Sequence, residues 1–365
     1  MLADFEGYGY DAGFSFQKSR LVIRGRSLDT DDYARTHETF EKGLTAVNDA
    51  GRRGFDVAAS DSVKDLAWKG LYPVFSHVVG LITSATPEHL STLDYSRGDD
   101  TGEDYPVRNG LGALIRQLGT NLNVHLSTRV NEVDWSRTGI RIATERGTIC
   151  ARSALLTVST SVLGSGGITF TPHLPTRIAS AISNCPLGTC EKVAFLLNSP
   201  LGMRRDESYL TVFDPDVPGT VPVSLYVNPF GYPTVIADLA GSCLPDLVAE
   251  GEPAMIDAAT QAMVNAFGAD IRDGILKATA TRWTKDADIL GAYSYVRPGC
   301  ASDRFALSEP IGDKLFLAGE AVSIRSYATC HGAYQSGLEA ADKALVSIGA
   351  RGPAGTNNYE LPSRH

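Results

Sequence analysis

The sequence predicts an α/β (α+β) fold in two parts, and three observations support this prediction. Short apolar segments of strand length follow one another over residues 124–158 and again over residues 191–241. Apolar residues at helical spacing mark other segments, most clearly residues 31–50 and 253–267. A chain of 365 residues also exceeds the length at which one hydrophobic core usually stops growing. We therefore expect two domains, interleaved or sequential.

Composition and charge exclude several classes of protein. A hydrophobic share of 43% with 21% charged residues is that of an ordinary globular protein rather than a disordered or fibrous one. The net charge of −9 and the absence of a basic run argue against nucleic-acid binding. No stretch approaches the roughly 18 uncharged apolar residues of a membrane helix, and residues 1–13 do not form a signal peptide. We expect no membrane partner and a cytoplasmic location.

The six cysteines form no CxxC pair and have no histidines at zinc-ligand spacing. They are Cys150, Cys185, Cys190, Cys243, Cys300 and Cys330. We therefore expect reduced thiols, without a disulfide framework and without a metal site.

The local patterns predict the order of elements along the chain. We expect helices over residues 31–50, 62–68 and 73–81, a loop over 97–104, and an extended entry into a helix over 105–118. A small sheet meander follows, with strands over residues 124–128, 129–135, 139–144 and 148–158. An antiparallel sheet follows, with strands over residues 191–198, 208–213, 221–227 and 234–241. The remaining elements are a helix over 253–267, an extended segment over 271–282, a strand over 314–318 and a small-residue helix within 326–348.

The most specific signal is a strand, loop and helix over residues 315–341. A Gly319-Glu320 pair follows the apolar strand, where unpaired N–H groups and helix N-termini collect ligands. Glu320 cannot bind phosphate, but it can accept hydrogen bonds from sugar or ribityl hydroxyls. Because strand-loop-helix units are common in α/β proteins, spacing alone leaves a structural and a ligand-binding interpretation open.

This run resembles the C-terminal FAD-binding motif of flavin-dependent amine oxidases, and it matches polyamine oxidases and lysine-specific histone demethylases best. The matching residues are Gly319, Glu320, Ile324, Arg325, Tyr327 and the run Ala328, Thr329, Cys330, His331, Gly332 and Ala333. The resemblance implies that Glu320 binds the ribityl or pyrophosphate part of FAD. It also implies that the backbone at Ala328, Thr329 and Cys330 faces the pyrimidine end of the flavin, where the helix dipole stabilises negative charge.

A second match covers residues 281–299, where the family has a Trp and a Tyr-Ser-Tyr run beside the flavin ring. Trp283 and Tyr293 would supply flat apolar walls, although both could equally be core residues. This run contains no cysteine, so we expect noncovalent FAD.

A third match makes Lys192 the family lysine that faces flavin N5, holds a water there and is linked to reoxidation by dioxygen. Lys192 interrupts an apolar strand, and such a lysine needs a partner or a wet strand end. A solvated strand-end lysine is the alternative.

The fourth match lies over residues 105–163 and concerns the adenine side of FAD. The resemblance implies that Val130 meets adenine through its backbone and that Thr157 ends a neighbouring strand. Ser159 and Ser161 stand where the family usually has Pro and Gly, so the turn geometry departs from the family pattern there.

The printed sequence contains no GxGxxG turn after a strand, although family members open with one to hold the FAD pyrophosphate. Gly7, Gly9 and Gly13 read as a turn, since no apolar strand precedes them. Three explanations remain: a second protein chain that supplies the fingerprint in a heteromer, a processed or truncated chain, or a flavin-free relative. We expect the first.

The resemblance also implies a domain order: 1–104 and 171–280 in the substrate domain, 105–170 and 281–350 in the FAD-binding domain, and 351–365 as a tail. We expect a FAD-dependent amine oxidase that uses dioxygen, with Lys192, Tyr293 and Thr329 as catalytic candidates. Thr329 replaces a tyrosine of the monoamine oxidase cage, which favours polyamines or secondary amines.

Two alternatives to this function remain open. An L-amino acid oxidase needs an arginine for the substrate carboxylate, and Arg108, Arg297 and Arg325 are the candidates. A flavin-free binding or scaffold subunit is the alternative outside the enzymes. His331 is as consistent with a structural role as with a catalytic one.

Overall fold

The computed structural model describes residues 20–99, 106–203, 208–217 and 219–350. Its chain divides into two compact units, each built from two separate stretches. Unit 1 comprises Met1–Leu126 and Cys185–Ala301, and unit 2 comprises Ser127–Asn184 and Ser302–His365. These limits differ from the predicted domain boundaries, whose functional assignment stays a prediction. The predicted glycine turn over residues 7–13 and the tail over 351–365 lie outside the described residues.

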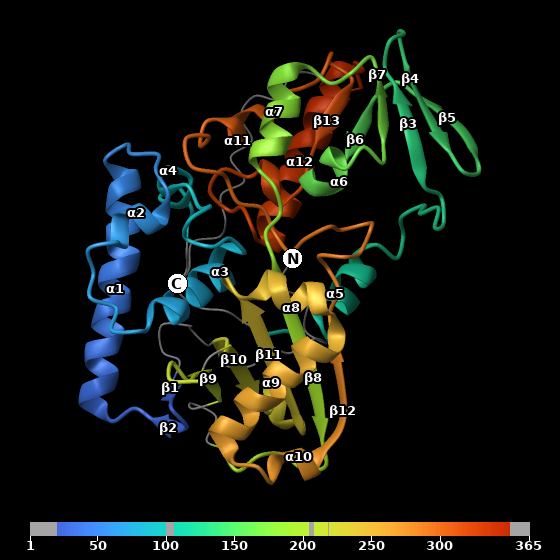
Figure 1. Ribbon diagram of the computed structural model, residues 1–365. Coiled ribbons are helices and arrows are strands. Elements are labelled where there is room, and N and C mark those ends of the chain that lie inside the picture. The colour runs from blue at the N-terminus through green and yellow to red at the C-terminus, as the bar shows by residue number, and fades with distance from the viewer. Residues whose placement is uncertain (1–19, 100–105, 204–207, 218, 351–365) are drawn as a thin grey trace, which may run out of the picture. The chain divides into compact units, whose positions relative to one another are not determined.

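A seven-stranded sheet forms the centre of unit 1 (Figure 1). Its strands, in spatial order, are β12 (Ile275–Ala280), β8 (Cys190–Leu197), β11 (Thr234–Ala240), β10 (Val223–Val227), β9 (Tyr209–Phe213), β1 (Arg20–Ile23) and β2 (Arg26–Ser27). All neighbours pair antiparallel except β1 and β9, which are parallel. The predicted antiparallel sheet is confirmed, and β1, β2 and β12 extend it.

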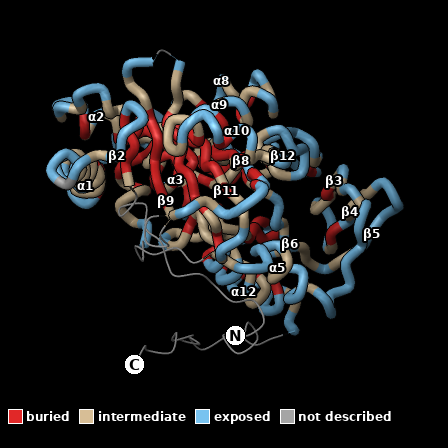
Figure 2. Tube along the Cα trace, turned by 90° about the horizontal axis from the view of Figure 1, so that it is seen from below, coloured by how far each residue is buried: buried red, intermediate tan, exposed pale blue. Residues whose placement is uncertain are grey.

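One face of this sheet carries the hydrophobic core of unit 1. Along β8, Val193, Phe195 and Leu197 are at most 2% exposed, whereas Leu196 between them is 42% exposed. This alternation follows from the two-residue period of a strand. The core continues through β9, β10 and β11, whose buried course is drawn in red in Figure 2, and it packs against α9 (Glu252–Phe267).

Helices of unit 1 surround the sheet. They are α1 (Thr30–Arg52), α2 (Ala59–Val63), α3 (Tyr72–Thr83), α4 (Thr92–Tyr95), α5 (Leu111–Leu118), α8 (Leu244–Glu250), α9 and α10 (Ile271–Gly274), with a 3₁₀ turn η4 at Pro229–Gly231. Helix α1 starts where the Asp29 side chain accepts a hydrogen bond from the Asp32 amide at 2.8 Å. Helix α3 lies directly on the end of β11, because a Cβ on Gly80 would meet the Gly241 nitrogen at 2.6 Å.

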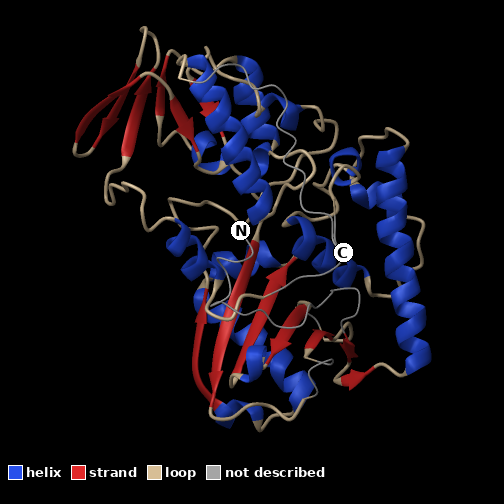
Figure 3. Ribbon diagram, turned by 180° about the vertical axis from the view of Figure 1, so that it is seen from behind, coloured by secondary structure: helices blue, strands red, loops and turns tan. Residues whose placement is uncertain are grey.

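Unit 2 contains two smaller sheets. The four-stranded sheet has the order β5 (Gly147–Ala151), β4 (Ile140–Thr144), β3 (Val130–Asp134) and β7 (Thr169–Thr171), and its strands fan out with a marked twist in Figure 3. The second sheet pairs β6 (Ala154–Leu156) in parallel with β13 (Leu315–Leu317). The helices are α6 (Thr160–Gly164), α7 (Thr176–Asn184), α11 (Asp303–Ala306) and α12 (Cys330–Ser347), with a 3₁₀ turn η5 at Glu320–Val322.

Three details of the predicted element order are wrong, and a fourth, the extended segment over residues 271–282, is confirmed only in its second part. Residues 124–128 form no strand, and Val124 and Leu126 are 61% and 75% exposed. The helix expected over 62–68 is α2, which ends at Val63, where the Trp68 indole N–H donates to the Val63 carbonyl at 3.2 Å. Residues 148–158 divide into strands of two different sheets, and residues 271–282 contain α10 and the paired strand β12.

Within the described part of the chain, the helices are too short or too polar to span a membrane.

The alternation along β8 yields a stability prediction. Phe195→Ala should lower the free energy of unfolding by about 3–5 kcal/mol, because it opens a cavity in the core of unit 1. The adjacent Leu196→Ala, on the exposed face, should change it by less than about 1 kcal/mol. Urea unfolding measures both values, and similar losses for the two variants would contradict this assignment of faces.

Candidate functional site

The first group of predicted residues lies where β13 ends in unit 2. Gly319 follows this strand with a φ of +143°, and nothing lies within 4 Å of where its Cβ would stand. The Ser336 hydroxyl of α12 accepts from the Gly319 amide at 2.9 Å and lies 2.8 Å from its carbonyl oxygen. The open side of Gly319 therefore allows a ligand to approach the backbone closely.

Glu320 holds the loop that leads into α12. Its Oε2 accepts a hydrogen bond from the Ala328 amide at 2.7 Å. Ala328 has a φ of +59°, which residues with a Cβ seldom adopt. Strained backbone of this kind concentrates at ligand sites, where the surrounding contacts impose it.

Thr329 caps the N-terminus of α12. Its hydroxyl accepts from the Gly332 amide at 3.0 Å and donates to the Ser326 carbonyl at 2.6 Å. Position 332 requires glycine, because a Cβ there would meet the Ser326 oxygen at 1.9 Å. The capping leaves the first-turn amides of this 18-residue helix at its positive end, where they can stabilise an electron-rich ring edge.

Cys330 begins α12, and its thiol stays protonated at neutral pH. Desolvation raises the pKa of the thiol, and the negative charge of Glu320 raises it further. A neutral thiol is a weak nucleophile, so this cysteine offers backbone rather than covalent chemistry.

Thr157 lies at the same sheet edge as Gly319. It follows β6 directly, and the Ala318 amide before Gly319 donates to the Leu156 carbonyl at 3.0 Å. Ser159, which stands where the family usually has proline, caps the N-terminus of α6: its hydroxyl accepts from the Val162 amide at 3.1 Å. Val130 is the half-buried first residue of β3, in the other sheet of unit 2.

In unit 1, Lys192 has the partner that a lysine in an apolar strand needs. Its Nζ pairs with Oδ1 of Asp238, the residue directly opposite it on β11. The Lys192 side chain is 43% exposed, whereas that of Asp238 is 6% exposed. Sequence reasoning missed Asp238, although an isolated acid within the apolar strand over 234–241 was a usable signal.

Glu191, one residue earlier, holds the loop that carries Trp283. The Glu191 carboxylate is 1% exposed and accepts from the Thr281 hydroxyl, from the Trp283 amide at 3.2 Å and from the Thr284 amide at 2.9 Å. The Lys192 carbonyl accepts from the Thr281 amide, and the Lys192 amide donates to the Thr281 hydroxyl, both at 2.8 Å. Trp283 is therefore held next to the start of β8. Sequence reasoning did not identify Glu191.

Tyr293 also lies at the start of β8. It packs with Cys190, the first residue of β8, together with Leu81 and Ala240. Its hydroxyl donates to the Leu81 carbonyl at the end of α3, and its own carbonyl accepts from the Ser84 hydroxyl at 2.6 Å. The Tyr293 ring is therefore locked in place, and Lys192, the Trp283 backbone and Tyr293 are each anchored at the start of β8 within unit 1.

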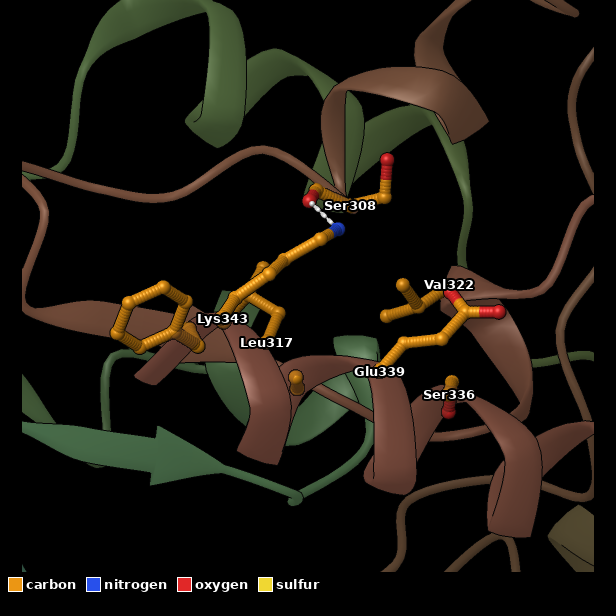
Figure 4. Close-up of a pocket in the computed structure, with 8 residues that line it drawn as sticks. Ser308, Leu317, Val322, Ser336, Glu339 and Lys343 are labelled. Atoms are coloured by element: carbon orange, nitrogen blue, oxygen red, sulfur yellow. Dashed lines mark hydrogen bonds between the residues drawn. The ribbon is translucent and has the colours of Figure 1, made fainter. Parts of the chain in front are cut away.

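A small hollow in unit 2 lies between β13 and α12 (Figure 4). In it, Lys343 of α12 donates to the Ser308 carbonyl at 3.0 Å. Its lining residues are Ser308, Phe316, Leu317, Val322, Ser336, Glu339, Ala340 and Lys343. None of the predicted site residues is among them, although Ser336, the hydrogen-bond partner of Gly319, is.

The comparisons with known proteins agree with this arrangement. Residues 34–345 match the family model described as flavin containing amine oxidoreductase. The chain belongs to this family. Membership confirms the predicted resemblance and implies FAD as the cofactor, while the roles of the individual site residues stay predictions.

Several curated amine oxidases and demethylases are similar to the chain. It is 29% identical over 289 residues to lysine-specific histone demethylase 1 homolog 3 of Oryza sativa subsp. japonica, covering 72% of this chain and 35% of that protein. It is 28% identical over 261 residues to polyamine oxidase 4 of the same organism, covering 68% of this chain and 50% of that protein. The chain thus spans about a third of the length of the first of these curated relatives.

A solved structure supports the fold. Cyclohexylamine oxidase from Brevibacterium oxydans IH-35A superposes with a TM-score of 0.75 at 18% identity, covering 96% of this chain and 84% of that one. Identity at this level shows the fold alone. The predicted α/β architecture of the amine oxidase type is confirmed.

The residues of unit 2 fit part of an FAD molecule. An open glycine at a strand end, a carboxylate that accepts hydrogen bonds and a helix N-terminus match a ribityl chain and the edge of a flavin where negative charge collects. Gly319 and Glu320 would meet the ribityl part, and the Thr329 and Cys330 backbone would meet the pyrimidine end.

The Glu191 contacts predict how the Trp283 loop responds to mutation. Glu191→Gln puts an NH₂ group against backbone amides that need an acceptor, so the free energy of unfolding should fall by about 1–3 kcal/mol. Amide hydrogen exchange should accelerate over residues 281–284. Glu250→Gln, an exposed position on α8, is the control and should change stability by less than about 0.5 kcal/mol. Unaltered exchange in the Glu191 variant would show that another contact holds the loop.

Proposed function

We propose that the chain carries the flavin-facing part of a FAD-dependent oxidase acting on the C–N bond of an amine. The observation that carries this proposal is the set of predicted residues gathered at the β6–β13 edge, in a chain of the amine oxidase family. Lys192, Trp283 and Tyr293, gathered at the start of β8, support it from unit 1.

FAD, when bound, would supply an acceptor for a hydride from the carbon next to an unprotonated amine, and dioxygen, taking up two electrons and two protons, would be reduced to hydrogen peroxide. The oxidised substrate is an imine, which water converts to an aldehyde or ketone and a free amine. The protein residues position and enclose: Trp283 and Tyr293 form apolar walls that exclude water, and the α12 N-terminus favours negative charge near the ring. This division of labour requires little acid–base apparatus.

The proposed substrate is a polyamine or another secondary amine. The names of the relatives, polyamine oxidase and lysine-specific histone demethylase, support this class. The net charge of −9 favours cationic substrates weakly. L-amino acid oxidation is the alternative, and of its three candidate arginines Arg108 is already engaged, because its guanidinium lies over the Phe230 ring at 4.7 Å.

Lys192 is proposed to act in the oxygen half of the reaction. Its ammonium lies at the half-exposed start of β8, where it can hold a water molecule. Hydride transfer from the amine needs no lysine, so the two halves should respond differently to its removal.

Lys192→Met should slow reoxidation of the flavin by dioxygen by about tenfold or more, because the variant removes a charged hydrogen-bond donor from the oxygen site. Flavin reduction by the amine should change by less than about threefold. Stopped-flow absorbance of the flavin separates the two steps. Unchanged oxygen kinetics would remove Lys192 from this role.

Exposed apolar surface of unit 2 supports the proposal that further protein covers it. The parallel β6–β13 pair has two strands, although parallel sheets are normally buried on both faces. On α12 the side chains of Tyr334, Leu338 and Leu345 are 40–46% exposed on one helical face.

We propose that a segment with the GxGxxG fingerprint covers this surface, either on the same polypeptide beyond the printed sequence or, as the heteromer prediction has it, on a second chain. Affinity purification at native expression level followed by mass spectrometry and an absorption spectrum tests this. We expect flavin bands together with a GxGxxG-containing polypeptide. Yellow, flavin-loaded protein composed of the printed sequence alone would refute the second segment, and colourless protein with its partner bound would support a flavin-free binding subunit.

A further inference from the structure

Four polar side chains form a continuous row across the sheet of unit 1, on the face opposite its hydrophobic core. Lys192, Asp238, Ser224 and Thr211 lie directly opposite one another on β8, β11, β10 and β9. Asp238, Ser224 and Thr211 are at most 4% exposed. Polar groups this deeply buried must be paired, and their pairing shows what the row does.

His77 of α3 closes the deep end of the row. Its Nδ1 lies 3.2 Å from the Ala240 carbonyl oxygen, which can only accept, so Nδ1 carries a proton. Complete burial lowers the pKa of His77 to about 4, so the ring is neutral at physiological pH. Its Nε2, 2.9 Å from Ser224 Oγ, therefore accepts the Ser224 hydroxyl proton.

With this assignment of protons, Ser224 has no hydroxyl proton left to donate to Asp238. Ser224 donates its single hydroxyl proton to His77, and its oxygen accepts from the Thr211 hydroxyl at 2.9 Å. His77, Ser224 and Thr211 thus satisfy one another's hydrogen bonds without a charged group. This leaves the Asp238 carboxylate to other donors, although Ser224 is its neighbour on β10.

Two side chains supply those donors. Asp238 Oδ1 pairs with the Lys192 ammonium, and Oδ2 accepts from the Tyr209 hydroxyl at 3.2 Å. Burial raises the pKa of Tyr209 well above its ordinary value, and the Asp238 charge adds to this, so Tyr209 remains a donor. Among these partners only Lys192 carries a charge that balances the buried carboxylate.

We propose that Asp238 is a positioning residue for Lys192, which it holds as an ammonium at one fixed place on the sheet surface. The Tyr209 hydroxyl donates to the second carboxylate oxygen of Asp238. Because His77 accepts the Ser224 hydroxyl proton, Ser224 cannot donate to Asp238. Lys192 therefore presents donors to a water molecule and does not act as a free base. This inference rests on the proposed function only where it concerns the oxygen reaction.

Chemical labelling of Lys192 tests the pairing without the cofactor. Full-length protein is treated with an amine-reactive reagent, and peptide mass spectrometry follows Lys192 and Lys42. Asp238→Asn should raise the labelling rate of Lys192 by about tenfold, because an adjacent opposite charge disfavours the reactive neutral amine. Glu38→Gln, which removes the exposed partner of Lys42 on α1, should change Lys42 labelling by less than about twofold. A Lys192 rate that Asp238→Asn leaves unchanged would overturn the proposal.

The unmodified protein offers a second measurement if Asp238→Asn does not fold. High salt weakens the attraction between the exposed side chains of Lys42 and Glu38. It weakens the attraction between Lys192 and Asp238 much less, because the Asp238 side chain is buried. In high salt Lys192 should label about tenfold more slowly than Lys42, although their side chains are 43% and 62% exposed. Equal rates would contradict a fixed pair.

The flavin-loaded protein then connects the pairing to the reaction. Asp238→Asn should slow flavin reoxidation as Lys192→Met does, and Asp238→Glu, which keeps the charge, should recover part of the rate. If Lys192→Met slows reoxidation while Asp238→Asn does not, the positioning role is wrong and the proposed function stands. If no flavin binds, the proposed function fails, and the labelling result still decides whether Asp238 holds Lys192.

Discussion

A carboxylate buried at the start of β8 needs hydrogen-bond donors, and residues 281–284 fold back over Glu191 to supply them. Side chains alternate along a strand, so the next residue, Lys192, faces the other side of the sheet, where Asp238 balances its charge. At this strand end, Glu191 and Lys192 thus find their partners on opposite faces of the sheet. The placement of Trp283 and the polar row behind Lys192 both depend on this arrangement.

Local patterns were sufficient for much of the fold. The four apolar segments of strand length over residues 191–241, interrupted by prolines, were enough to predict an antiparallel sheet, and the helix over 253–267 needed only its periodicity. The site residues of unit 2 also lie close together in the sequence, from Gly319 to Cys330. Their geometry follows from one loop and one helix cap, which short-range motifs describe well.

The partners of the site residues could not be predicted in the same way. Lys192 and Asp238 are 46 positions apart, and Glu191 and Trp283 are 92 positions apart. Both pairs depend on strand register, and a shift of one residue would turn Lys192 toward the core. The strand predicted over residues 124–128 failed for a related reason: its apolar side chains found no strand to pair with among the described residues.

The parallel pairing of β6 with β13 has a consequence for how the chain is made. The whole stretch Cys185–Ala301 lies between these strands in the sequence, so β6 leaves the ribosome long before its partner exists. Contacts of such high sequence separation slow folding and leave apolar strands exposed meanwhile. The second sheet of unit 2 can therefore form only after residues 315–317 have been synthesised, and until then β6 is an apolar strand without its neighbour.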